Sequence, residues 1–262
     1  MKIDAIILAG KSNIREVEDI RAEDKPRYPI KGKPMYEYVI DAARDSKLIN
    51  RIVVTVPIAT DCSSFEYKVD KVLFTDQQVA DNIVMGVEYL SDAEFVFVLS
   101  SDLPLLTPDA IDTFIMECEK EGDYDLYYPV HDMEDVLDRY PTTKRTYAKI
   151  AEGKFTGSNT ALFKPFIIKN NVKLFRRIFE QRKNPIGMAR VIGINCMIKA
   201  LRGTLSIELL EDRIGKLIGG RGKAIISKQI EMGIDVDKKE DLELVESILS
   251  GDKNKIAANF QF

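Results

Sequence analysis

A short apolar run near the start of the chain ends in a glycine followed by polar residues. Residues 5–9 are all apolar, as in a strand that is buried on both faces of a parallel sheet. Gly10 lets the backbone turn, and Lys11, Ser12 and Asn13 follow it. In an open α/β sheet, ligands bind just beyond the carboxyl ends of the strands, where the amides of a turn can hold an anion. The pattern therefore indicates an anion-binding loop, with an ordinary strand-to-loop turn as the alternative.

A second group of residues fits the same loop. Lys25 lies fifteen positions after Gly10, and Gly32-Lys33-Pro34 precedes a helical pattern. In this order the residues resemble the opening motif of the MobA-like NTP transferase family, which are nucleotidyltransferases of the GT-A type. The resemblance implies that the loop binds an NTP and that Lys25 and Arg15 offset charge at its α-phosphate. The residues implied to bind the NTP are Leu8, Ala9, Gly10, Lys11, Ser12 and Asn13.

Two features depart from the MobA-like pattern. Lys11 stands where the family has a second glycine, and the loop from Gly10 to Lys25 is longer than in the molybdenum-cofactor members. The longer spacing and the Lys25-Pro26 pair are more similar to sugar-1-phosphate nucleotidylyltransferases. The sequence therefore leaves both branches open.

A carboxylate follows a second apolar run. Residues 95–99 predict a central strand, and Asp102 comes just after it. A local cap of the turn would be an ordinary role for Asp102. However, the strand, Asp102, Leu103-Pro104-Leu105 and Thr107-Pro108 resemble the metal-binding motif of MobA-like enzymes. This implies that Asp102 is a metal ligand and a catalytic residue, and Thr107 is expected to cap the helix that follows.

Two further carboxylates occur near the end of the chain. Asp235 and Asp237 precede Glu240-Asp241-Leu242, a passage that resembles the closing motif of the same families, with Asp237 at the ligand position. Residues i and i+2 of a strand point to one face, so both carboxylates can face one ion. Asp237 also stands where an N-cap of the last helix is expected, and this role is compatible with metal binding. Because Mg²⁺ prefers one or two carboxylates together with phosphates and water, we expect a Mg²⁺ site with Asp102, Asp237 and Asp235.

Polar residues in two other places are candidates for substrate contacts. In related nucleotidyltransferases, residues after the third strand read the base, and a Gly-x-Asn before an apolar strand lies on the acceptor side. Gln78 and Asn82 match the first position, although the opening turn of a helix explains them equally well. The acceptor-side candidates are Gly157, Asn159, Lys144 and Arg145, and a solvated loop is an equal explanation for the last two.

The candidate site residues follow predicted strands, so they can lie together only if these strands end at the same edge of a sheet. Apolar runs alternate with helical patterns, which predicts parallel strands joined by helical crossovers. We therefore expect an α/β, Rossmann-like GT-A nucleotidyltransferase fold, with a mostly parallel mixed sheet flanked by helices. One domain would cover residues 1–262, with an NTP-binding part at about 1–130 and an acceptor-side part at about 131–262. Later helices are predicted at about 165–182, 185–198 and 204–217, and a strand at 224–227.

The composition is ordinary for a globular protein and excludes several classes. The chain has 262 residues, 45% hydrophobic and 31% charged, and its net charge of −4 argues against general nucleic-acid binding. Three scattered cysteines indicate reduced thiols rather than a disulfide or zinc framework. No apolar run approaches the length of a membrane span. We expect a cytoplasmic protein without a membrane partner.

One motif favours a different class of protein. Gly219-Gly220-Arg221-Gly222 is a GxxG, which KH domains place between two helices to clamp RNA. Glycines at a helix end before a strand explain it more simply. A non-catalytic nucleotide or RNA binder is nevertheless the alternative from another class.

The sequence thus predicts a Mg²⁺-dependent nucleotidyltransferase that moves an NMP from an NTP to a small phosphorylated acceptor and releases pyrophosphate. An acceptor phosphate is already anionic, so the reaction requires no general base. GTP and CTP are the first nucleotide candidates, and a pterin or a sugar phosphate is the acceptor candidate. The base, the acceptor and the oligomeric state are not specified by the residues.

Overall fold

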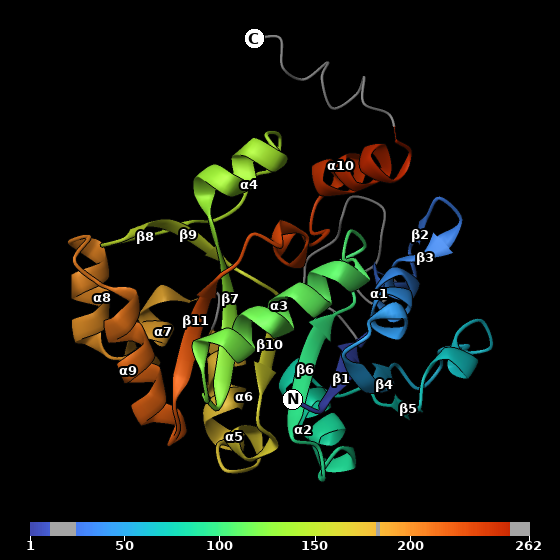
Figure 1. Ribbon diagram of the computed structural model, residues 1–262, viewed down its shortest axis with the longest axis horizontal. Coiled ribbons are helices and arrows are strands. Elements are labelled where there is room, and N and C mark those ends of the chain that lie inside the picture. Colours follow the sequence, from blue (N-terminus) through green and yellow to red (C-terminus); the bar gives the residue numbers. More distant parts are fainter. Residues whose placement is uncertain (11–24, 182–183, 252–262) are drawn as a thin grey trace.

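The computed structural model describes residues 1–10, 25–181 and 184–251, and a mixed sheet forms its centre (Figure 1). One half of the sheet is parallel, in the order β5-β4-β1-β6. The carboxyl ends of these strands therefore meet at one edge, where α/β proteins bind ligands. The bounds are β1 Ile3–Leu8, β4 Ile49–Val56, β5 Lys71–Phe74 and β6 Phe95–Ser100.

The other half of the sheet is largely antiparallel. β10 runs antiparallel to both β6 and β7 and joins the two halves. β7 also pairs in parallel with β11 and antiparallel with β9, and β9 pairs with β8. The predicted α/β class with a mixed sheet is confirmed. The bounds are β7 Leu126–Asp132, β8 Ala148–Ile150, β9 Gly153–Gly157, β10 Thr160–Phe163 and β11 Gly222–Ile226.

Helices cover both faces of the parallel half because its strands are apolar on both sides. Ile7 and Phe97 belong to a buried cluster on the face covered by α1 and α3. Ile6 and Val98 point the other way, into a cluster with α2, α5 and α6. Burial on both faces explains the near-continuous apolar runs in the sequence. The bounds are α1 Met35–Asp45, α2 Val79–Tyr89, α3 Pro108–Glu121, α5 Pro165–Lys169 and α6 Val172–Gln181.

The helices after β10 are shorter than the sequence pattern predicts. The helix predicted over 165–182 is interrupted between α5 and α6, where the side-chain amide of Asn171 donates to the carbonyls of Ile167 and Ile218. The next predicted helix is broken at Gly193, whose φ of 117° favours glycine. In the described ranges, no helix is long and apolar enough to cross a membrane. The helices are α7 Pro185–Ile192, α8 Ile194–Leu201 and α9 Ile207–Ile218.

Several small elements gather on the ligand edge of the sheet. Buried apolar side chains such as Ile30, Leu105, Ile234 and Val245 pack there into one cluster, which joins segments from both ends of the chain. In Figure 1, α4 and α10 lie on this same side. The elements are a 3₁₀ turn at Lys25–Arg27, β2 Pro29–Ile30, β3 Lys33–Pro34, α4 Met133–Arg139, a 3₁₀ turn at Ile230–Gly233 and α10 Lys239–Leu249.

The GxxG motif joins a helix to a strand. Gly219 follows α9 in the left-handed region (φ 66°, ψ 36°) and ends the helix. Gly222 begins β11, which pairs with β7 in the main sheet. A KH loop lies between two helices, so the RNA-binding alternative is not supported by this part of the fold.

Candidate active site

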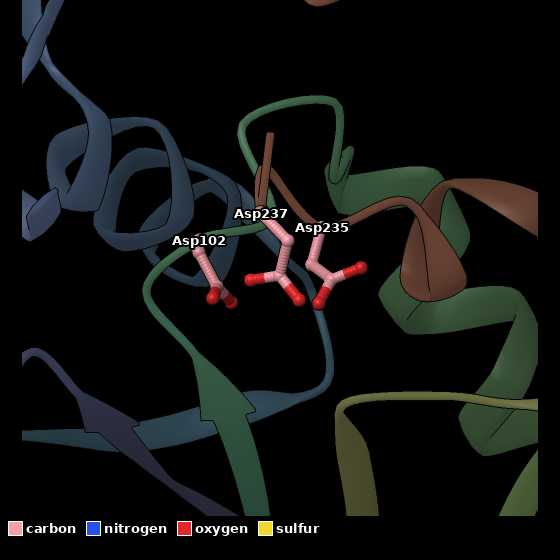
Figure 2. Close-up of side chains that lie close together, drawn as sticks. All are labelled: Asp102, Asp235 and Asp237. Atoms are coloured by element: carbon pink, nitrogen blue, oxygen red, sulfur yellow. The ribbon is translucent and has the colours of Figure 1, made fainter. Parts of the chain in front are cut away.

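Three carboxylates from separate sequence motifs lie together beyond the carboxyl edge of the sheet (Figure 2). Asp102, Asp235 and Asp237 each offer an oxygen atom, and these atoms are all within 4.8 Å of one another. Asp102 follows β6, whereas the other two lie between the 3₁₀ turn Ile230–Gly233 and α10. Asp235 is buried, and the other two are partly exposed. The structure thus brings together the three residues that the sequence nominated as metal ligands.

A backbone hydrogen bond holds the two segments side by side. The amide of Val236 donates to the carbonyl of Asp102 at 3.0 Å. Ile234 and Val236 are both buried in the apolar cluster on the ligand edge. The alternate residues, Asp235 and Asp237, carry the carboxylates. The segment is not a strand, so that premise of the sequence prediction is wrong, but the alternation still places both carboxylates in the cluster.

Lys25 supplies a cation to this cluster. Its Nζ lies 2.8 Å from Oδ2 of Asp102 and 2.7 Å from Oδ1 of Asp237. Burial alone would lower the pKa of Lys25, but the two carboxylates raise it above its usual value. Burial likewise opposes ionisation of Asp102, yet Lys25 and a hydrogen bond from the Ser100 hydroxyl hold the Asp102 pKa below its usual range. Lys25 and Asp102 therefore form a charged pair.

Asp235 has partners of its own. The guanidinium of Arg145 makes an ion pair with Oδ1 of Asp235 and donates to its backbone carbonyl at 2.7 Å. The side-chain amide of Asn159 donates to Oδ2 at 2.6 Å. Arg145 and Asn159, both predicted to face the acceptor, thus contact the carboxylate cluster.

Asp237 does not cap the last helix. Lys238 is the residue before α10, and the carboxylate of Asp241 accepts from the backbone amides of Asp237 and Lys238 at 3.0 Å each. The side chain of Asp237 faces Lys25 instead. The cap role expected for Asp237 is therefore wrong. Sequence reasoning missed Asp241, although an acidic residue at the third position of a helix is a capping signal.

The sheet uses backbone groups of the residues that open the predicted NTP loop. The carbonyl of Leu8 accepts from the Ser101 amide at 3.3 Å, and the amide of Ala9 donates to the Thr55 carbonyl at 2.9 Å. These two groups of Leu8 and Ala9 are therefore engaged within the fold. Four predicted residues of the loop, Lys11, Ser12, Asn13 and Arg15, lie outside the described residues.

Gly10 is in close contact with the start of α2. A Cβ atom at this position would lie 2.5 Å from Nδ2 of Asn82. Asn82 is buried, and its Oδ1 accepts from the hydroxyl of Thr75 at 3.1 Å. Asn82, a candidate for base contact, therefore lies directly beside the point where the loop leaves β1. A side chain at position 10 would therefore require the amide of Asn82 to shift.

Gln78 occupies a more exposed position at the same end of α2. It lines a small open cavity of about 100 Å³ between the start of α2 and the end of α6. Asp81 and Arg176, which also line the cavity, form an ion pair at 2.7 Å. Because α2 follows the parallel strand β5, the cavity lies toward the ligand edge of the sheet.

Only some of the residues predicted to face the acceptor lie near the carboxylate cluster. Gly157 ends β9, where a Cβ atom would lie 2.4 Å from the hydroxyl of Tyr128. Asn159 reaches Asp235 as described, so this part of the motif adjoins the cluster. Lys144 is exposed. Of the Lys144 and Arg145 pair, only Arg145 contacts the carboxylates.

Comparisons with known proteins place the chain among the nucleotidyltransferases. The chain belongs to the MobA-like NTP transferase domain family, which matches residues 5–186. A probable molybdenum cofactor guanylyltransferase from Natranaerobius thermophilus is 28% identical over 178 residues, which are 66% of this chain and 79% of that protein. The resemblance inferred from the motifs is confirmed, and the protein is a nucleotidyltransferase.

Solved structures agree with this assignment. A hypothetical transferase from Thermus thermophilus superposes with a TM-score of 0.76 and 30% identity, over 92% of this chain and 100% of that chain. That match extends beyond residue 186, where the family match ends. A CMP:2-keto-3-deoxy-manno-octonic acid synthetase complexed with CTP has a TM-score of 0.62 at 16% identity, over 96% of this chain and 100% of that chain. At this identity the likeness concerns the fold alone.

Proposed function

We propose that this protein transfers an NMP from an NTP to a small phosphorylated acceptor in a Mg²⁺-dependent reaction. An oxygen of the acceptor phosphate attacks the α-phosphorus of the NTP. The bond between the α-phosphorus and the oxygen that bridges the α- and β-phosphates breaks, and pyrophosphate leaves. The observation that carries the proposal is the convergence of Asp102 and Asp237 on one cation position, which Lys25 holds. In this proposal the NTP occupies the side built by residues 1–130 and the acceptor the side built by 131–262, within one domain.

The donor set fits Mg²⁺, which is usually held by one or two carboxylates together with substrate phosphates and water. The ammonium of Lys25 serves as a stand-in, because it shows that oxygens of Asp102 and Asp237 face one cation. Asp235 is the third candidate ligand, but both of its carboxylate oxygens already have partners. We therefore rank Asp102 and Asp237 as the first ligands. When bound, the ion would neutralise charge on the triphosphate and the leaving pyrophosphate.

The chain's own residues have distinct roles in this proposal. Lys25 carries a point charge on a flexible stem, so its ammonium can move from the carboxylates toward the transferred phosphate. Gly10 begins the loop whose amides, with Arg15 and Lys11, would hold the triphosphate. Gln78 would contact the base, with Asn82 positioning Gly10. On the acceptor side, Gly157 and Asn159 would shape the wall, and Lys144 would pair with the acceptor phosphate.

The comparisons and the cysteines support a choice of nucleotide and of compartment. GTP is our first candidate because a relative is named as a guanylyltransferase, and CTP is the second because a structure of the same fold holds CTP. The three cysteines are free and buried, which supports a reducing compartment such as the cytoplasm. The longer loop before Lys25 makes a sugar 1-phosphate the alternative acceptor beside a phosphorylated pterin.

A substrate screen tests the proposal directly. ATP, GTP, CTP and UTP are each combined with sugar 1-phosphates and with phosphorylated pterins, and pyrophosphate release is measured with Mg²⁺ and with a chelator. We expect one pair to release pyrophosphate and to yield an NMP adduct by mass spectrometry. Asp102→Asn is the control and should be nearly inactive. Equal release by this variant, or release that is independent of divalent ions, would contradict the proposal.

A further inference from the structure

Arg145 pairs with Asp235, the carboxylate of the cluster that Lys25 does not contact. Its guanidinium pairs with Oδ1 of Asp235 and donates to the backbone carbonyl of the same residue at 2.7 Å. Asn159 donates to the remaining oxygen, Oδ2, at 2.6 Å. The side chains of Arg145 and Asp235 are only 11% and 10% exposed. Asp235 therefore has a donor on each oxygen and little contact with solvent.

Asp102 and Asp237 are held in a different way. They share the single Nζ of Lys25, at 2.8 and 2.7 Å. A lysine ammonium is a point charge on a flexible chain, whereas the planar fork of an arginine is pre-organised for a carboxylate. An ion that enters the cluster can thus replace Lys25 more easily than it can replace Arg145.

We propose that Arg145 limits the metal site to two carboxylates and thereby makes it selective for Mg²⁺ over Ca²⁺. The inference rests on the proposed metal role of Asp102 and Asp237. Ca²⁺ takes six to eight oxygen ligands, often from several carboxylates. Mg²⁺ is usually coordinated by one or two carboxylates and retains several of its water ligands. An oxygen of Asp235 already lies within 4.8 Å of oxygens of the other two carboxylates, and without Arg145 it would be available as a third carboxylate ligand.

The test measures ion binding without nucleotide. Bound Mn²⁺ is followed by electron paramagnetic resonance, and Mg²⁺ and Ca²⁺ are titrated as competitors, which gives a Kd for each ion. The proteins are the wild type, Arg145→Gln and the double variant Arg145→Gln/Asp235→Asn. Lys149→Gln is the matched control because it removes the same charge from an exposed residue of β8, four positions away.

We expect Arg145→Gln to bind Ca²⁺ at least about tenfold more tightly relative to Mg²⁺, because ligand charge tunes Ca²⁺ affinity over orders of magnitude. Lys149→Gln and the double variant should keep the wild-type ratio. An unchanged ratio in Arg145→Gln, or a gain that persists without Asp235, overturns the inference but not the Asp102 site. If the wild type binds none of the ions, or Asp102→Asn binds them equally well, both the site and the inference fail.

Folding of the variant is checked in the same series. Removal of Arg145 leaves a buried carboxylate without its charged partner, which lowers stability. An ion that binds only the folded state raises Tm by mass action. We therefore expect Ca²⁺ to raise the Tm of Arg145→Gln by more than that of the wild type, and Mg²⁺ to act equally on both. Equal rescue of Arg145→Gln by the two ions would overturn the inference.

Discussion

The ammonium of Lys25 lies 2.8 Å from the carboxylate of Asp102, although 77 positions separate the two residues in the chain. Asp237, from the far end of the chain, completes the group at 2.7 Å from the same nitrogen. The side chain of Lys25 is 4% exposed, so the pair is largely shielded from water. A cation is thus already present where the proposed metal ion and the triphosphate would meet.

Replacement of Lys25 tests its role in the transfer step. We expect Lys25→Ala to lower kcat by about a hundredfold, the effect of removing one group that stabilises the transition state. Lys47→Ala, an exposed lysine after the end of α1, is the control. Circular dichroism would show whether each variant is folded. Near wild-type turnover would mean that Lys25 has a structural role as the partner of Asp102 and Asp237.

Asp102 and Asp237 should act as one unit if they hold one ion. We expect Asp102→Asn and Asp237→Asn each to lower kcat by at least about a hundredfold, as for the loss of a principal transition-state interaction. The double variant should lose little more, because residues that act together are not additive. The measurement is kcat at saturating NTP and Mg²⁺ for all four proteins. Losses that multiply in the double variant would show that the two carboxylates act separately.

The contact between Gly10 and Asn82 makes a further prediction. A Cβ at Gly10 would lie 2.5 Å from Nδ2 of Asn82, so Gly10→Ala must displace that side chain or the loop. Overpacking costs about 1–3 kcal/mol of stability. Because a displaced loop would bind the NTP less well, we also expect the KM for the NTP to rise by about tenfold, which corresponds to about 1.4 kcal/mol of binding free energy. Gly222→Ala is the matched control, since its Cβ would meet no atom nearer than 3.6 Å.

A second substitution distinguishes a steric effect from a loss of backbone freedom. Asn82→Ala removes the atom that Gly10→Ala would meet, and the double variant should recover part of the NTP affinity. If the double variant binds NTP no better than Gly10→Ala, the role of Gly10 depends on its backbone and not on the space beside Asn82.

Local patterns in the sequence were sufficient for much of this site. The apolar run of β6 and the Thr107-Pro108 start of α3 bracket Asp102, and the Thr107 hydroxyl accepts from the Ala110 amide as predicted. Such signals lie within a few residues and depend on strand burial and helix capping. They place a residue at the end of an element, which is enough to nominate Asp102 and Gly10.

Contacts between distant segments could not be predicted in the same way. Arg145 and Asp235 are 90 positions apart, and no local signal shows that one neutralises the other. The contact of Asn82 with Gly10 is another example, because a polar residue early in a helix gives no indication of which loop will cover it. The same limit applies to helix breaks such as that between α5 and α6, where a side-chain amide bonds to a carbonyl of α9.

The burial of His131 leads to a prediction of how the stability of the protein depends on pH. It is fully buried, its Nδ1 donates to the carbonyl of Ser227 at 2.9 Å, and its Nε2 has no partner among the described residues. Burial lowers its pKa from the usual value of 6.5. The folded protein therefore keeps His131 neutral at pH values where the unfolded chain binds a proton.

The sign of the effect follows from this difference in proton binding. Below pH 6.5, His131 binds a proton in the unfolded state but stays neutral in the folded state. The free energy of unfolding therefore falls as the pH falls, by up to about 1.4 kcal/mol per pH unit. The decrease ends at the pH where His131 of the folded protein also binds a proton. His131→Asn keeps a donor for Ser227 but does not titrate, and we expect it to lose less stability between pH 6.5 and 5. Urea unfolding of both proteins at several pH values measures this. Because the chain has one histidine, no other imidazole contributes in this range. Parallel stability curves for the two proteins would contradict a buried neutral His131.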